Sequence, residues 1–142
     1  MKKTKEYKDK LRSSGIRATK QRLMISKILF NRKDTFHFTI EDLNKLIEKS
    51  IDQKVSLATI YNTVHAFKKM GYLKEISIEG NKTYYDTNTS NHHHFFDEDS
   101  EKLTDISNQK VFVKGMPKPP SNKFIKSVEV LFRVASNNHN QK

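Results

Sequence analysis

The stretch SLATIYNTVHAFKKMGYLKEISIEGNKTYYD, residues 56–86, decides the fold. Its first half predicts a helix, because it starts on a serine, which is a good N-cap, reaches a glycine, which is a good terminator, and has apolar residues at helical spacing between them. These apolar residues are Leu57, Ile60, Val64, Phe67 and Met70. Its second half predicts two strands, 73–78 and 82–86, around a turn at Glu79-Gly80-Asn81. A helix followed by a hairpin is typical of the recognition helix and wing of a winged-helix domain.

The residues before this stretch predict three more helices and loops in the order that a winged helix requires. Residues 4–14 predict a short helix that ends before Gly15. Thr19 and Thr39 are good N-caps for two further helices, separated by a loop over residues 31–38. The third and fourth helices therefore predict a helix-turn-helix.

Beyond residue 86 the pattern changes to a polar segment followed by strands. Residues 87–91 predict a hinge, and the segments 92–96, 111–113 and 127–134 predict strands. The proline-rich segment 116–120 predicts a rigid connection that is not a strand. The expected domains are a DNA-binding domain over residues 1–86, a hinge over 87–91, a dimerisation and sensor domain over 92–136 and a disordered tail over 137–142.

The positive charge is concentrated in the first part of the chain. Residues 1–85 contain 19 Lys and Arg against 9 Asp and Glu, whereas residues 86–142 contain 8 against 7. Such an asymmetry is typical of a surface that binds a polyanion, although lysine-rich chains can also be merely very soluble. Because the excess coincides with the predicted reading helix, we expect this part to bind double-stranded DNA.

The composition excludes several classes of site. The chain has no cysteine, which excludes disulfides, thiolate catalysis and a cysteine-type structural zinc site. It has no apolar run near the roughly 20 residues that a membrane span needs. Its first residues, MKKTKEYKDK, lack the apolar stretch of a secretory signal. We therefore expect a cytoplasmic protein with no membrane partner.

Short polar side chains near the start of the predicted reading helix suit contacts with base edges in the major groove. Asparagine can bond adenine through two hydrogen bonds, and the threonine methyl group can contact the methyl group of thymine. The candidate DNA-binding residues are Ser56, Thr59, Tyr61 and Asn62 for bases and Arg17, Lys20 and Lys69 for the backbone. His65 on the same helix is expected to face DNA or solvent. The alternative is an ordinary amphipathic helix with a polar solvent face.

The triplet His92-His93-His94 predicts a binding site for a metal ion or haem. Side chains alternate along a strand, so His92 and His94 share one face and His93 lies on the other. Two such imidazoles can bind one metal, and Asp86, Asp105 and His37 can complete an N/O shell suited to Fe2+, Mn2+ or Zn2+. A haem iron can also take an axial imidazole from this cluster. The alternative is a solvated histidine-rich turn.

Three segments in this order resemble the ferric uptake regulator family. Residues 56–73 resemble its recognition helix with a "LATVY" core, residues 15–29 resemble its opening helix, and residues 37–43 resemble its "H-hydrophobic-(S/T)-x-E-D-L" segment. The resemblance implies an α+β fold, with an N-terminal winged-helix DNA-binding domain followed by a small α/β dimerisation domain. It also implies a homodimer that reads an inverted-repeat operator and represses iron-homeostasis genes, and not an enzyme.

The resemblance carries the sensor residues over position by position. His37 matches a histidine of the family's interdomain loop, Asp86 stands where the family usually has a glutamate, and Asp105 falls on a ligand glutamate. For the triplet, the alignment with the family leaves two possibilities open. If the hinge has a one-residue deletion, His92 and His94 fall on the family's ligand positions, whereas an ungapped alignment places His93 there. The two CxxC pairs of the family's structural zinc site have no counterpart here.

Within the family, the chain resembles the iron response regulator branch. The shared features are the HHHFF motif at 92–96, the proline-rich connection, the YNT of the recognition helix and the absence of structural cysteines. This resemblance implies a regulator of haem and iron genes that responds to haem. The Cys-Pro haem motif of some members is absent, so haem would have to bind at the histidine triplet.

Three alternative functions share these residues. The first is a regulator of the same fold that senses Fe2+, Mn2+ or Zn2+ directly. The second is a winged-helix module that binds DNA or RNA without a ligand. The third is a metal-dependent hydrolase, in which His37, His92, His94 and two acids hold a catalytic metal with an open position. No glycine-rich phosphate loop or nucleophile motif supports it.

Overall fold

The computed structural model describes residues 2–50, 54–78, 80 and 82–137. The chain divides into two compact units, the first ending at Thr89 and the second beginning at Ser90. This boundary falls inside the polar segment 87–91. The predicted disordered tail, residues 138–142, and the predicted turn residues Glu79 and Asn81 lie outside the described residues.

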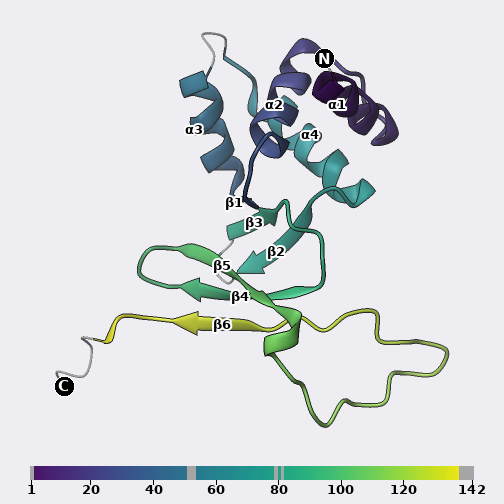
Figure 1. Cartoon of the computed structure of the whole chain (residues 1–142), viewed down its shortest axis with the longest axis vertical. Helices are drawn as coiled ribbons and strands as arrows, with labels where there is room; N and C mark the ends of the chain where they lie inside the picture. Colours follow the sequence, from purple (N-terminus) through teal and green to yellow (C-terminus); the bar gives the residue numbers. More distant parts are fainter. Residues whose placement is uncertain (1, 51–53, 79, 81, 138–142) are drawn as a thin grey trace. The chain divides into compact units, whose positions relative to one another are not determined.

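The first unit is a helical layer on a small sheet (Figure 1). Its elements are α1 (Lys2–Ser13), α2 (Lys20–Phe30), β1 (His37–Phe38), α3 (Ile40–Ser50), α4 (Leu57–Met70), β2 (Lys74–Ile78) and β3 (Lys82–Asp86). The strands form an antiparallel sheet in the order β1-β3-β2. This is the expected winged helix, with one addition. The segment 31–38, expected to be a loop, ends in the short strand β1, because β3 offers it a free edge.

Local hydrogen bonds explain where the helices begin and end. Thr19 caps α2 and Ser56 caps α4, each accepting a backbone N–H three residues later. Thr39 and Asp42 cap α3 reciprocally, since each side chain accepts from the other's backbone N–H at 3.1 and 3.0 Å. Gly71 ends α4 with φ of 91°, a left-handed conformation that glycine adopts without strain. All three expected N-caps are therefore confirmed.

The core of the first unit gathers around Phe67 of α4. This side chain is fully buried, and its ring packs edge-on against Phe30 and Tyr72 at centroid distances of 5.2 and 6.1 Å. The prediction that the apolar stripe of α4 is buried is confirmed for its middle residues and wrong for the residues at its two ends. Leu57 and Met70 are 59% and 52% exposed, because the helix extends past the elements that cover its centre.

The second unit is a three-stranded sheet in the order β5-β4-β6. Its elements are β4 (His92–Asp97), β5 (Lys102–Ser107), the 3-10 turn η1 (Asn108–Lys110) and β6 (Leu131–Val134). The pair β4–β5 is antiparallel and the pair β4–β6 is parallel. Residues 90–137 contain no α-helix, so the described part of this unit is β-rich where an α/β domain was expected.

Two strand predictions in this unit need correction. Residues 111–113 form no strand, because no neighbouring strand offers them hydrogen-bonding partners. The last strand begins at Leu131 and not at residue 127. Its start is displaced because the backbone N–H of Val130 bonds the Nδ1 atom of His93 at 2.9 Å instead of joining the β4 ladder. Residues 111–130 thus form a long excursion from the sheet, visible in Figure 1. No helix in the described part of the chain is long and apolar enough to cross a membrane.

Candidate functional site

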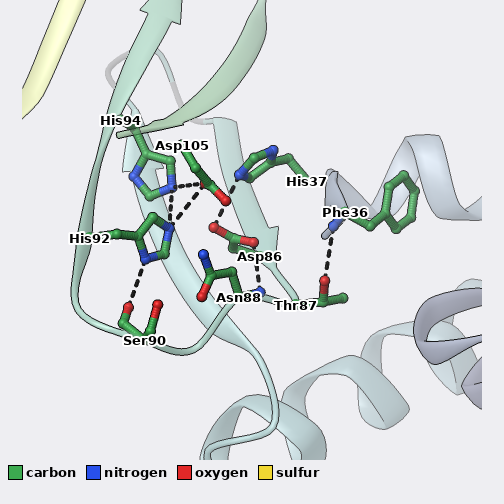
Figure 2. A network of polar contacts seen from close by, with 9 residues as sticks. All are labelled: Phe36, His37, Asp86, Thr87, Asn88, Ser90, His92, His94 and Asp105. Carbon is green, nitrogen blue, oxygen red and sulfur yellow. Dashed lines mark hydrogen bonds and ion pairs between the residues drawn. The ribbon is translucent and has the colours of Figure 1, made fainter. Parts of the chain in front are cut away.

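A histidine–carboxylate pair lies on the sheet of the first unit. Cross-strand register places His37 of β1 opposite Asp86 of β3, and the His37 Nε2 atom lies 3.0 Å from Asp86 Oδ2. Asp86 is completely buried, although its Oδ1 atom accepts the backbone N–H of Asn88 at 2.8 Å. A buried carboxylate needs a positive or hydrogen-bonding partner, and the paired imidazole supplies one. Figure 2 shows this pair.

A second group lies on the sheet of the other unit and consists of His92, His94 and Asp105, here called the triad (Figure 2). His92 and His94 are two residues apart on β4 and share a face, and Asp105 of β5 is the register partner of His94. The two Nε2 atoms lie 2.9 Å apart, and Asp105 Oδ1 lies 3.1 Å from the first and 3.2 Å from the second. Both imidazoles are buried, while the carboxylate is one quarter exposed. Three ligand atoms therefore converge on one small volume.

The hydrogen bond of His92 to the backbone prepares its other nitrogen to bind a cation. Its Nδ1 atom lies 2.7 Å from the carbonyl oxygen of Ser90. A carbonyl only accepts, so Nδ1 carries the proton, and in the neutral ring Nε2 then bears a lone pair. That lone pair faces the carboxylate oxygen of Asp105. A proton or a metal ion among these atoms relieves the repulsion, and backbone orientation of this kind is common behind metal-binding histidines.

His93 does not join the triad. It points to the opposite face of β4, where Val130 N–H donates to its Nδ1 and its Nε2 lies 3.1 Å from the side-chain oxygen of Asn108. Both ring nitrogens are thus engaged within the protein, and the side chain is only 3% exposed. The contacts of His93 therefore do not support it as a candidate ligand. They connect β4 to Asn108, just before the 111–130 excursion, and to Val130, at its end.

The donor set of the triad fits a divalent metal ion. Ligands about 2.1 Å from a metal and at right angles to each other lie about 3.0 Å apart. The three separations of 2.9–3.2 Å match that spacing. Two imidazoles and one carboxylate form the ligand set typical of ferrous iron, and the same atoms suit manganese or zinc. Without cysteine in the chain, all protein ligands would be nitrogen or oxygen.

The α4 helix carries the candidate base-reading side chains on its exposed face. Tyr61 and Asn62 are exposed there, and so is Lys69 toward the helix end. His65 is also exposed and its ring stacks on Tyr61 at a centroid distance of 5.8 Å. This stack was not predicted from the sequence, although two aromatic rings four residues apart on a helix are its usual signal. Together these side chains form a polar and aromatic surface suited to base edges.

Two of the candidate base-reading residues have another task. Ser56 accepts the backbone N–H of Thr59 at 3.1 Å, and the hydroxyl of Ser56 lies 2.9 Å from the hydroxyl of Thr59. Their side chains therefore build the N-cap of α4. This cap determines where α4 starts.

The start of α2 offers a basic surface for a phosphate backbone. Arg17 and Lys20 are exposed beside the N-terminus of this helix, where the helix dipole favours anions. A shallow cleft there is lined by Arg12, Gly15, Ile16, Arg17, Ala18 and Thr19. The geometry and charge match the task expected for Arg17 and Lys20.

Comparisons with known proteins agree with this arrangement. Residues 13–125 match the ferric uptake regulator family. The peroxide-responsive repressor PerR of Staphylococcus aureus is 34% identical over 96 residues, which are 68% of this chain and 63% of that protein. The chain thus spans less than two thirds of the length of the curated relatives it matches.

Solved structures share the fold. The ferric uptake regulator of Pseudomonas aeruginosa with manganese has a TM-score of 0.67 at 17% identity, over 92% of this chain and 98% of that one. The Helicobacter pylori ferric uptake regulator Fur has a TM-score of 0.68 at 14% identity, over 95% and 92%. These structural likenesses confirm the α+β winged-helix fold. The family itself is shown by the sequence match over residues 13–125. The chain belongs to the ferric uptake regulator family.

Proposed function

We propose that this protein is a sequence-specific DNA-binding transcription regulator that responds to a divalent metal ion. The observation that carries the proposal is the convergence of His92, His94 and Asp105 on one point, in a chain whose other unit is a basic winged helix. The curated relatives are repressors by name, which supports repression as the output here.

DNA reading is assigned to the exposed face of α4. Asn62 and Tyr61 contact bases, while Arg17, Lys20 and Lys69 contact phosphates and supply most of the affinity. Ser56 and Thr59 hold the start of the helix in place. The protein acts as a homodimer in the cytoplasm and reads an inverted repeat with one α4 helix for each half-site.

The His37–Asp86 pair and the triad are assigned to the same ion. The triad alone supplies three ligands, which leaves positions open on a metal that prefers five or six. The pair supplies one more nitrogen and one more oxygen. Asp86 and His92 are six residues apart in the chain, so they remain within about 20 Å of each other in any conformation. An ion that takes ligands from both units would restrict their relative motion and thereby set the spacing of two reading helices.

Bare metal is favoured over haem by the spacing of the triad. Two imidazole nitrogens 2.9 Å apart match neighbouring ligands of a single small ion. A haem iron bound by two histidines has them on opposite sides, at about twice the metal–nitrogen distance of 2.0–2.1 Å. Haem bound through a single imidazole remains the alternative ligand, as the resemblance to the iron response regulator branch implies.

Peroxide is a second candidate signal, favoured by the names of the relatives. The chain has no cysteine, so a peroxide response would depend on a redox-active metal at the triad or on methionine. Ferrous iron supports such chemistry, and manganese reacts far less readily. A response of the ferrous form, but not of the manganese form, would assign this signal.

The deciding experiment selects an operator from random duplexes and measures binding with Fe2+, Mn2+, Zn2+ or haem. We expect a saturable divalent metal to change operator affinity at least about tenfold, and His92→Ala with His94→Ala to abolish that change. Lys102→Ala, an exposed lysine of β5 outside the triad, is the matched control. If the metals had no effect on operator affinity, and haem bound the wild type but not the histidine variant, the ligand of the regulator would be haem and not a metal ion. No selected sequence would refute the DNA function.

The base and phosphate assignments have their own test. Asn62→Ala should cost about 1–3 kcal/mol on the selected operator and relax the preference at one position. Lys69→Ala should weaken binding to all sequences and reduce the salt dependence of binding. Equal losses on operator and random DNA for both variants would contradict the assignment of α4.

A further inference from the structure

The first helix, α1, carries its charges on two separate sides. Lys5, Lys8 and Arg12 follow one another at spacings of three and four residues, so they lie on one side of the helix. Glu6 and Asp9 have the same spacing as Lys5 and Lys8 but begin one residue later, so they lie about 100° further round the helix. The side formed by Lys5, Lys8 and Arg12, here called the basic flank, therefore carries positive charge alone.

The basic flank is not neutralised within the described part of the chain. Lys5 and Arg12 are exposed, and Lys8 is partly buried. None of the three side chains forms a hydrogen bond or an ion pair with another described residue. Like charges three and four residues apart on a helix destabilise it, so an anionic partner that covers the basic flank is favoured.

Other side chains of α1 fix this helix to the end of α4 (Figure 1). The Nζ atom of Lys10 lies 4.2 Å from the ring centroid of Tyr72, which follows α4, and 4.7 Å from that of Phe30. The hydroxyl groups of Ser13 and Tyr72 lie 2.7 Å apart. Leu11 is completely buried in the core of the first unit. The position of the basic flank relative to the reading helix is therefore fixed.

The basic flank continues into the surface that is assigned to DNA phosphates. Arg12 lines the same shallow cleft as Arg17, at the start of α2. Lys20 follows in the first turn of that helix, and the chain has no acidic residue between Asp9 and Asp34. The basic flank and the start of α2 therefore form one continuous basic surface.

The length of the basic flank matches a short stretch of DNA backbone. Lys5 and Arg12 are seven residues apart, which corresponds to about 10 Å along a helix. Successive nucleotides in one strand of a duplex are spaced about 3.4 Å along its axis, so the basic flank spans about three of them. One strand therefore offers about one phosphate for each of the three cations.

We propose that the basic flank binds phosphates of the DNA duplex beyond the base pairs that α4 reads. The proposal rests on the proposed DNA-binding function and adds about three nucleotides to the contact of each copy. Backbone contacts carry no sequence information, so this contact raises the affinity for every duplex and leaves the preference for the operator unchanged. Glu6 and Asp9 repel the backbone from the neighbouring side of α1 and so restrict its path to the basic flank.

Removing the three charges should lower the salt dependence of DNA binding. The variant combines Lys5→Gln, Lys8→Gln and Arg12→Gln and is here called the neutral flank variant. The slope of log affinity against log salt concentration should become shallower by about three for each bound copy, because each phosphate contact contributes about 0.9. The change should be equal on the selected operator and on random DNA.

A control variant removes the same charge from exposed positions of the second unit. It combines Lys102→Gln, Lys110→Gln and Lys118→Gln and should keep the wild-type slope, which excludes an effect of net charge alone. Both variants should unfold at the wild-type temperature, because none of the six side chains is fully buried.

Uncharged DNA locates the contact. When the phosphates that flank each half-site are replaced by methylphosphonates, the wild type should bind as weakly as the neutral flank variant, and the variant should lose nothing further. Equal slopes for the wild type and the neutral flank variant on random DNA would overturn the proposal. So would a variant that binds DNA normally but no longer binds vesicles of anionic phospholipid, which would make the basic flank a membrane contact. Random DNA needs no operator, so this slope tests the basic flank even where selection finds no sequence and the proposed function fails.

Discussion

Replacing Asp105 by asparagine tests whether the triad is a metal site. Asp105 Oδ1 lies 3.1 and 3.2 Å from the two imidazole nitrogens, and it is the only negative charge in the triad. The substitution keeps the shape and removes the charge. Loss of a group that only orients a ligand already costs 10–100-fold in metal affinity, so loss of this ligand should cost about a hundredfold or more.

The affinity change converts into a stability change. At a metal concentration about 1,000 times the wild-type Kd, binding stabilises the folded protein by about 4 kcal/mol, and a hundredfold weaker variant retains about 1.4 kcal/mol. The expected loss of roughly 3 kcal/mol corresponds to a Tm lower by roughly 5–10 °C for a chain of this size. Without metal the variant and the wild type should unfold at similar temperatures.

The assay is thermal unfolding with and without Mn2+, together with direct titration of the metal. Asp9→Asn in α1 is the matched control, because it removes an exposed carboxylate far along the chain from the triad. If Asp105→Asn kept the full metal-induced rise in Tm while the control behaved as wild type, the triad would not be the metal site. Ligand spacing alone would then not indicate a metal site in this chain.

Three further perturbations test the fold that positions these groups. Phe67→Ala should destabilise the first unit by about 3–5 kcal/mol in urea unfolding, because the ring is fully buried, whereas Met70→Ala on the exposed end of the same helix should cost under about 1 kcal/mol. Ser56→Ala should cost about 1 kcal/mol by loss of the α4 cap, and Ser56→Asp should restore most of it. The backbone N–H groups of Asp99 and Ser100 lower the pKa of Asp97. Its contribution is therefore present above the unfolded aspartate pKa of about 3.9 and is lost as pH falls through the lower folded value, so Asp97→Asn should be less stable than wild type at neutral pH and equal to it in strong acid.

Much of the first unit was predictable because its signals are local. Thr19, Thr39 and Ser56 were identified as N-caps from residue type and position, and each cap forms in the structure. The fate of Leu57 and Met70 was not predictable in this way. Helical spacing places them on the apolar stripe, but whether a stripe position is covered depends on how far the neighbouring elements extend.

The triad also depends partly on local sequence signals and partly on tertiary contacts. Strand alternation placed His92 and His94 on one face, but two alignments left open which histidines are ligands. In the structure the rings have different contacts: Val130 and Asn108 engage both nitrogens of His93, whereas the Ser90 carbonyl leaves the Nε2 atom of His92 directed toward Asp105. The contacts from Val130 and Ser90 are made by backbone groups, which have no residue-type signature.

The winged helix, the basic first part, the absence of thiol ligands and the residue types of the candidate metal-binding groups were all predictable from the amino-acid sequence. These properties depend on composition, periodicity and capping, all of which act within a few residues. Three features depend on the tertiary structure: residues 111–113 are not a strand, the last strand begins at Leu131, and His93 contacts Val130 and Asn108 on the face opposite to the triad. Each of these depends on whether a partner from far along the chain is present at hydrogen-bonding distance, and no local pattern encodes that.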